Sequence, residues 1–259
     1  MELNRIYNEN CLETLRRMPD GFIDLTVTSP PYDNLRKYNG YEFDFEPIAR
    51  ELFRVTKKGG VVVWVVGDAT INGSETGTSF RQALYFKEIG FNLHDTMIYQ
   101  KTNPIPLTHN RYEQEWEYMF VFSVGKPAVW NPLTKRNLTA GTFVNWSTRA
   151  VENGAARRSR EEVTVTKSES FRNNIWSYTL ALDKVGDHPA PFPVPLAKDH
   201  ILSWSNEGDL VYDPFMGSGT TAKAAHQLKR RWIGSEISAE YVELANKRLE
   251  PYLAQEQLF

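Results

Sequence analysis

A glycine-rich turn late in the chain constrains the fold more than any other stretch. An apolar run at residues 210–212 leads into Asp-Pro-Phe-Met-Gly-Ser-Gly-Thr-Thr at positions 213–221, and a helical pattern begins near Thr220. Glycines at 217 and 219 can adopt positive φ and let the backbone approach a ligand, while the helix that follows directs N–H groups toward it. The pattern predicts a strand, a tight turn and a helix that bind a nucleotide cofactor.

The position of this turn argues against a nicotinamide cofactor. The two glycines and Ala222 fit the dinucleotide fingerprint, with Glu236 spaced to hold ribose hydroxyls. Only residues 223–259 follow, whereas a nicotinamide-binding fold needs several more strands after its fingerprint. Asp213 would also repel a pyrophosphate. We therefore expect an α/β fold whose other strands come from the N-terminal side, and a cofactor made of adenosine with an amino-acid tail.

A second motif lies upstream, where this permuted order predicts the chemistry. Residues 22–27 alternate like a half-buried strand and run into Ser29, Pro30, Pro31 and Tyr32. The two motifs in this order resemble the permuted (beta-group) S-adenosylmethionine-dependent DNA methyltransferases that modify exocyclic amines. The resemblance covers most of the chain except its middle region. It implies a Rossmann-like, mostly parallel sheet with an antiparallel hairpin at its edge, in the circularly permuted methyltransferase order.

The upstream motif also indicates which base is modified. Serine rather than aspartate before Pro-Pro-Tyr resembles the cytosine-N4 branch more than the adenine-N6 branch, which stays the nearest alternative. We expect Ser29 Oγ and the Pro30 carbonyl to accept the N–H bonds of the amine, Pro31 to stiffen the turn, and Tyr32 to stack on a base rotated out of the duplex. Methylation at carbon 5 would need a thiolate, and Cys11 lies in an ordinary amphipathic run.

The resemblance assigns the cofactor, S-adenosylmethionine, to the late motif and its surroundings. Glu236 is expected to bind the ribose hydroxyls, and the backbone at Phe215 and the two glycines to close on the methionine moiety. Thr220 and Thr221 are expected to cap the helix and to offer hydroxyls to the cofactor carboxylate. Asn10 either contacts the adenine or caps a helix. The full expected set is Asn10, Asp213, Phe215, Gly217, Ser218, Gly219, Thr220, Thr221 and Glu236.

The middle of the chain differs in composition and is the expected DNA-reading part. From Lys126 to Lys184 there are 10 Lys and Arg residues against 5 Asp and Glu, although the whole chain carries a formal charge of −2. We divide the chain into a catalytic half (1–124), a target-recognition region (125–187) with no long periodic run, and a cofactor-binding half (188–259). A solvated surface module is the plainer alternative for this region. The expected DNA contacts are Arg36, Lys37, Arg157, Arg158 and Arg160.

Several partners and alternatives follow from the same observations. The expected partner is double-stranded DNA, and the resemblance leaves open a homodimer and a separate cognate restriction endonuclease. Histidine spacing predicts no metal site, and no apolar run is long enough for a membrane span, so a cytoplasmic protein is expected. Besides adenine-N6 methylation, a catalytically silent DNA-binding module would also keep the basic segment.

Three further elements are predicted from local patterns. An amphipathic helix from Phe45 to Phe53 should be stopped by the Lys-Lys-Gly-Gly run at residues 57–60. The β-branched run at residues 61–66 should be a strand covered on both faces. Residues 91–100 and 117–123 should each form a strand, and the resemblance implies that the two pair as the hairpin at the sheet edge.

Overall fold

The structure is a computed structural model of the 259-residue chain, and two compact units make up its fold. It describes residues 1–31, 43–103, 111–147, 151–152, 155–156, 161–179 and 193–255. The first unit comprises Met1–Asn131 and Asn174–Phe259, and the second comprises Pro132–Asn173.

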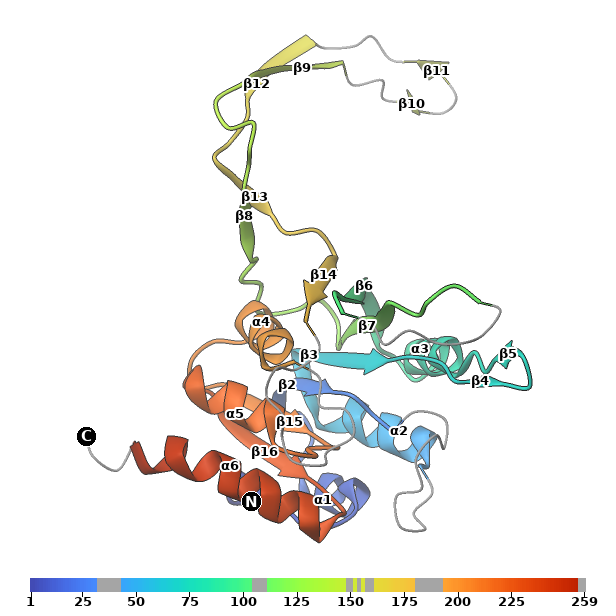
Figure 1. The fold of residues 1–259 in the computed structure, drawn as a ribbon, viewed down its shortest axis with the longest axis vertical. Coiled ribbons are helices and arrows are strands. Elements are labelled where there is room, and N and C mark those ends of the chain that lie inside the picture. Colours follow the sequence, from blue (N-terminus) through green and yellow to red (C-terminus); the bar gives the residue numbers. More distant parts are fainter. Residues whose placement is uncertain are drawn as a thin grey trace. The chain divides into compact units, whose positions relative to one another are not determined.

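The first unit is built on an eight-stranded sheet in the described part of the chain (Figure 1). Every neighbouring pair is parallel except those made by β7, which runs antiparallel to β3 and β6. In spatial order the strands are β1 (Arg5–Tyr7), β16 (Arg231–Ser235), β15 (Leu210–Asp213), β2 (Ile23–Thr28), β3 (Thr56–Val66), β7 (Trp116–Ser123), β6 (Asn92–Lys101) and β14 (Ile175–Tyr178). The two strands of the late region therefore pair with strands of the early region, which confirms the permuted order.

Helices cover both faces of this sheet. The first group, packed on one another along one face, is α1 (Cys11–Arg17), α2 (Phe45–Val55) and α3 (Thr78–Glu88). The second group is α4 (Val194–Trp204), α5 (Thr220–Gln227) and α6 (Ala239–Gln255). A short hairpin of β4 (Thr70–Ile71) and β5 (Ser74–Glu75) precedes α3. No helix among the described residues is long and apolar enough to cross a membrane.

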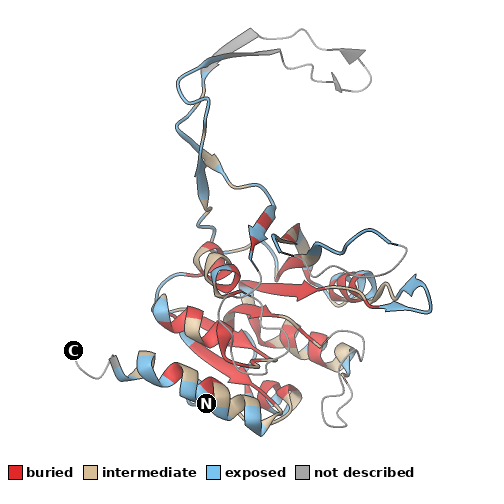
Figure 2. Cartoon of the chain, viewed as in Figure 1, coloured by how far each residue is buried: buried red, intermediate tan, exposed pale blue. Residues whose placement is uncertain are grey.

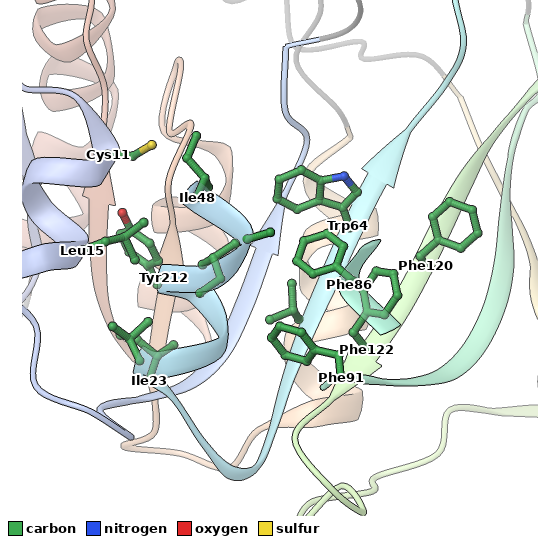
Figure 3. Packing of buried hydrophobic residues seen from close by; sticks show 14 of the residues in the cluster. Cys11, Leu15, Ile23, Ile48, Trp64, Phe86, Phe91, Phe120, Phe122 and Tyr212 are labelled. Carbon is green, nitrogen blue, oxygen red and sulfur yellow. The ribbon is translucent and has the colours of Figure 1, made fainter. Parts of the chain in front are cut away.

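Side chains alternate into the two helical layers, as the sequence predicts. Even-numbered residues of β3, with Trp64 at their centre, pack with α1, α2 and α3 in one cluster that includes Phe86 and Tyr212 (Figure 3). From Gly59 to Val66 every residue of β3 is buried, so this strand is covered on both faces as predicted. Buried residues accordingly concentrate on the sheet and the helix faces turned to it (Figure 2).

The prediction that the Lys-Lys-Gly-Gly run at residues 57–60 stops the preceding helix is wrong. Helix α2 ends at Val55, and residues 57–60 belong to β3, where the pairing jumps from Ile23–Thr56 to Leu25–Val61. A Cβ added at Gly60 would lie within 2.9 Å of the Lys57 carbonyl oxygen and 3.0 Å of that of Asp24. This glycine is therefore needed for close backbone packing at a strand irregularity rather than for a helix end.

The predicted hairpin is present, and a further strand pairs outside it. Strands β6 and β7 are antiparallel, and β14 adds parallel to β6 with Ile175 opposite Ile98. Residues before the second unit also join the first, because the Asn131 N–H donates to the Ser203 carbonyl at 2.9 Å. The second unit is therefore narrower than the predicted region of residues 125–187.

The second unit consists of three nested antiparallel ladders. They pair β8 (Thr134–Arg136) with β13 (Glu169–Phe171), β9 (Phe143–Ser147) with β12 (Glu161–Val165), and β10 (Val151–Glu152) with β11 (Ala155–Ala156). None of its residues with described burial is buried, and Leu138 and Phe143 are among its exposed apolar side chains. The unit is a two-stranded ribbon with no core of its own in the described residues, and such ribbons are marginally stable alone.

Candidate active site

The two sequence motifs lie side by side at one edge of the sheet. Strand β15 pairs parallel with β2, with Val211 opposite Leu25 and Tyr212 opposite Thr26. The carboxyl ends of the two strands therefore meet, and Thr28 Oγ1 donates a hydrogen bond of 2.6 Å to Asp213 Oδ1 across them. Ligands of open α/β sheets bind at this kind of edge. The structure therefore places the serine-containing turn (residues 29–31) beside the glycine turn (residues 214–219).

The glycine turn has the predicted backbone and is attached to β16. Gly217 and Gly219 have φ of 52° and 82°, so both adopt the left-handed conformation that glycine favours. The Met216 N–H donates to the Ser235 carbonyl at 2.9 Å, and the Gly217 N–H donates to Glu236 Oε2 at 2.8 Å. These two bonds fix the turn against the end of β16.

Glu236 is held in place from two sides. Its second oxygen, Oε1, accepts from the Ser238 N–H at 2.8 Å, and the residue is only 8% exposed. Burial raises the pKa of this carboxyl above its usual range, while the backbone amides of Ser238 and Gly217 oppose the rise. The Ile237 amide also contacts this carboxylate, so the three backbone amides use three of its four lone-pair sites and leave one for a hydroxyl donor. The arrangement suits the predicted ribose contact, which stays a prediction.

Asp213 sits in a buried network rather than facing an open space. Its Oδ1 accepts from Thr28 Oγ1 and, at 3.0 Å, from the Phe215 N–H, while its Oδ2 accepts from Thr221 Oγ1 at 2.7 Å. The residue is 1% exposed. Desolvation by burial raises the pKa of Asp213 to about 6, although the three hydrogen bonds oppose the rise.

The hydroxyls of Thr220 and Thr221, at the start of α5, make hydrogen bonds other than the predicted ones. The N-cap of α5 is Gly219, and no side chain caps the helix. Thr220 Oγ1 accepts from the Arg248 guanidinium at 3.1 Å, and the same group donates to the Ser218 carbonyl at 3.1 Å. The expectation that Thr220 and Thr221 cap the helix is therefore wrong, because Arg248 and Asp213 hold these hydroxyls inside the fold.

Asn10 acts as the helix cap that was one of its two predicted roles. Its Oδ1 accepts from the Leu12 N–H at 2.9 Å at the start of α1. A contact from Asn10 to adenine stays a prediction. Sequence reasoning missed Asn8, whose Nδ2 donates to the Glu236 carbonyl at 2.9 Å and so ties the end of β1 to the end of β16.

The remaining predicted residues fall into two groups. Ser29 and Pro31 are half-buried and Pro30 is buried, and Phe215 packs edge-on against Phe43 with ring centroids 5.6 Å apart. Outside the described residues lie Tyr32, Arg36, Lys37, Arg157, Arg158 and Arg160. Within the described part of the chain, no group of three or more His, Cys, Asp or Glu residues is arranged to hold a metal ion.

The raised pKa of Asp213 gives a prediction for stability against pH. Between pH of about 4 and 6 the folded protein keeps this carboxyl protonated while the unfolded chain ionises it, so the unfolding free energy should fall as pH rises through that window. The fall attributable to Asp213 is at most about 3 kcal/mol. Urea unfolding from pH 4 to 7 should show it as a difference between wild type and Asp213→Asn. If the unfolding free energies of the two proteins changed in parallel with pH, the raised pKa would not belong to Asp213.

A second prediction concerns the support of the glycine turn by β16. A Cβ at Gly234 would lie 3.0 Å from Met216 Cγ and 3.1 Å from Met216 Cβ, so Gly234→Ala should displace Met216 within the turn. We expect a loss of about 1–3 kcal/mol in unfolding free energy, measured by urea titration. Gly67→Ala is the control, because its Cβ would make an ordinary 3.5 Å contact with Glu117. Equal losses in both variants would show that the contact with Met216 is not the cause.

The sheet with its two apposed turns is the arrangement of a Rossmann-like methyltransferase, and comparison with known proteins agrees with this class of protein. The family model described as DNA methylase, of the N6 and N4 type, matches residues 23–247, and the chain belongs to this family. The orphan methyltransferase M.BamHII of Bacillus amyloliquefaciens is 56% identical over 243 residues, which cover 90% of this chain and 91% of that protein.

Solved structures agree on the fold. The PvuII DNA methyltransferase, described as cytosine-N4-specific, superposes with a TM-score of 0.70 at 21% identity, covering 94% of this chain and 85% of that one. A putative DNA modification methylase from Thermus thermophilus gives a TM-score of 0.66 at 26% identity, covering 96% and 94%.

Proposed function

We propose that the protein transfers a methyl group from S-adenosylmethionine to the exocyclic N4 amine of cytosine in duplex DNA. The observation that carries this proposal is the apposition of the serine-containing turn and the glycine turn at the ends of β2 and β15. One turn is then available to the base and the other to the methyl donor. The family establishes DNA methylation, and the choice of cytosine N4 rests on Ser29.

The residues around the glycine turn fit the cofactor. S-adenosylmethionine supplies an electrophilic methyl group on a sulfonium when bound, and the Thermus thermophilus methylase has been solved in complex with it. In our proposal Glu236 binds the ribose hydroxyls through the lone-pair capacity that its three backbone partners leave available. Phe215, half-buried within the turn, has an aromatic ring of the kind that suits a cationic sulfur.

The serine-containing turn is assigned to the amine. The lone pair of an exocyclic amine is delocalised into the ring, which makes it a weak nucleophile. Ser29 Oγ and the Pro30 carbonyl each accept one of its N–H bonds, which favours a pyramidal nitrogen with its lone pair directed at the methyl group. The two prolines fix φ and offer no competing N–H donors. Serine is too weak a base to take the proton first, so the proton leaves with or after methyl transfer.

DNA contact is proposed for the second unit, including its basic residues, and for two basic residues of the early half of the chain. The major groove of B-DNA admits a two-stranded β-ribbon, and none of the residues of this unit whose burial is described is buried. Arg157, Arg158 and Arg160 are proposed to contact phosphates, together with Arg36 and Lys37. Tyr32 is proposed to stack on the extruded base.

Nucleoside analysis tests the proposed base directly. The protein is incubated with methyl-labelled S-adenosylmethionine and duplex DNA of mixed sequence, and the digested nucleosides are identified by mass spectrometry. We expect labelled N4-methylcytosine. Labelled N6-methyladenine without N4-methylcytosine would assign the enzyme to the adenine branch, and the absence of any label would favour a silent DNA-binding module.

A further inference from the structure

One buried carboxylate joins three separate segments of the active site. Asp213 ends β15, and its three hydrogen-bond donors come from the end of β2 (Thr28), the glycine turn (Phe215 N–H) and the first turn of α5 (Thr221). Thr28, Asp213 and Thr221 are 0%, 1% and 1% exposed. Thr221 Oγ1 also lies 3.2 Å from the Val27 carbonyl, so α5 contacts β2 directly as well. We call these three side chains the threonine–aspartate junction.

The chemistry of this junction points to a geometric role. No described cation forms an ion pair with Asp213, and the nearby Glu236 disfavours its ionised form. Burying a carboxyl group in such surroundings costs free energy unless every oxygen is well hydrogen-bonded, and such networks specify one arrangement of their members. Apolar contacts are not directional, so they would hold the two strands together without fixing the relative position of their ends as these hydrogen bonds do.

The junction is also poorly placed to bind the cofactor itself. Both oxygens of Asp213 are occupied by internal donors, and almost none of the residue is exposed. Thr28, by contrast, immediately precedes Ser29, while Phe215 lies in the turn assigned to the methyl donor. A displacement of Thr28 is therefore transmitted to Ser29 through one peptide unit.

We propose that Asp213, with Thr28 and Thr221, is a positioning residue that sets the separation between the serine-containing turn and the glycine turn. The inference rests on the proposed function in that these two turns hold the base and the methyl donor. Methyl transfer requires its reacting atoms within about 3–3.5 Å, and a misplacement of about 1 Å costs on the order of 100-fold in rate. The junction acts through Ser29 and touches neither reactant.

A matched pair of variants on β2 tests this role. Thr26 and Thr28 lie on the same strand and are both 0% exposed, but the Thr26 hydroxyl has no hydrogen-bond partner among the described residues. Thr28→Val removes the junction hydroxyl, Thr26→Val removes an equally buried hydroxyl outside the junction, and Thr28→Ser keeps the junction hydroxyl. Each is measured well below its unfolding temperature for kcat, for Kd of S-adenosylmethionine by calorimetry, and for amide hydrogen exchange at Ser29.

The expected results separate positioning from a general loss of structure. Thr28→Val should lower kcat by about 10- to 100-fold, leave the Kd within about threefold and speed exchange of the Ser29 amide. Thr28→Ser and Thr26→Val should resemble wild type in all three measurements. If Thr28→Val fails to fold, Asp213→Asn replaces it, because asparagine keeps one acceptor oxygen and should show a milder form of the same effects.

Two results would overturn the proposal. One is equal loss of kcat in Thr28→Val and Thr26→Val, and the other is unchanged exchange at Ser29 in Thr28→Val. The exchange measurement also separates this inference from the proposed function. If wild type labels no cytosine, the proposed function fails, while faster exchange at Ser29 in Thr28→Val would still support the junction.

Discussion

Ser29→Ala is expected to lower kcat by about 100-fold or more while the Kd for S-adenosylmethionine stays within about threefold. Removing one preorganised hydrogen-bonding group from a reacting centre typically costs on the order of 100- to 1,000-fold in kcat. Ser29 follows the end of β2 and is half-buried, at the sheet edge where the glycine turn also lies. The loss falls on kcat because the hydroxyl is assigned to the amine and not to the cofactor.

Single-turnover methyl transfer and calorimetry measure the two halves of this prediction separately. Ser74→Ala, in the exposed β4–β5 hairpin, removes a hydroxyl that donates to the Glu75 carbonyl and serves as the control. Its kcat and Kd should equal those of wild type. A Ser29→Ala variant that loses cofactor binding in proportion to turnover would contradict the assignment of Ser29 to the base.

Glu236→Ala is expected to weaken S-adenosylmethionine binding by about 100-fold. The carboxylate is buried at the end of β16 and accepts from the backbone amides of Gly217, Ile237 and Ser238. Alanine therefore removes the ribose acceptor and leaves these amides without their partner. Hydrogen bonds to a charged group contribute about 1.5–3 kcal/mol, and 1.4 kcal/mol corresponds to a factor of ten in affinity.

Calorimetric titration with S-adenosylmethionine measures this loss of affinity. Glu240→Ala provides the control, because Glu240 is an exposed carboxylate in the first turn of α6. Glu236→Gln should fall between wild type and alanine, since it keeps one acceptor oxygen. Cofactor affinity in Glu236→Ala equal to that of Glu240→Ala would show that Glu236 does not hold the ribose.

The elements with strong periodicity could be predicted from the sequence, since burial on a sheet imposes a repeat. The β3 run and the strand, turn and helix around Gly217 appear where the pattern placed them. The pair of glycines at 59 and 60 was misread because the same residues that end helices also permit close backbone contacts within strands. The local sequence alone does not show whether such a glycine ends a helix or allows close backbone contact within a strand, because that depends on the partner strand.

The ribbon of the second unit escaped prediction for a different reason. None of the side chains of β8 and β13 is buried, so no alternation of apolar and polar residues marks either strand. Strand β14 is similarly short, at 4 residues, and its place beside β6 depends on a long-range pairing that no local signal encodes.

In the site, the two turns could be identified from the sequence, but the hydrogen bonds that hold them in place could not. The motifs identified the residues of both turns, and the parallel pairing of β15 with β2 brings them together at the edge of the sheet. Arg248 and Asn8 hold the turn and the neighbouring strand ends through hydrogen bonds to backbone carbonyls, which need only a donor of suitable reach. Nothing in their sequence context distinguishes them from other polar residues on a helix or after a strand.

The central claim is that the serine-containing turn presents the base to a methyl donor held by the glycine turn. The most direct test is a crystal structure of the protein with S-adenosylhomocysteine and a duplex that carries its cytosine substrate. The account predicts an extruded cytosine whose N4 lies within hydrogen-bond distance of Ser29 Oγ, about 3 Å, and which faces the cofactor sulfur. A cofactor bound away from the glycine turn, or a base bound away from Ser29, would contradict it.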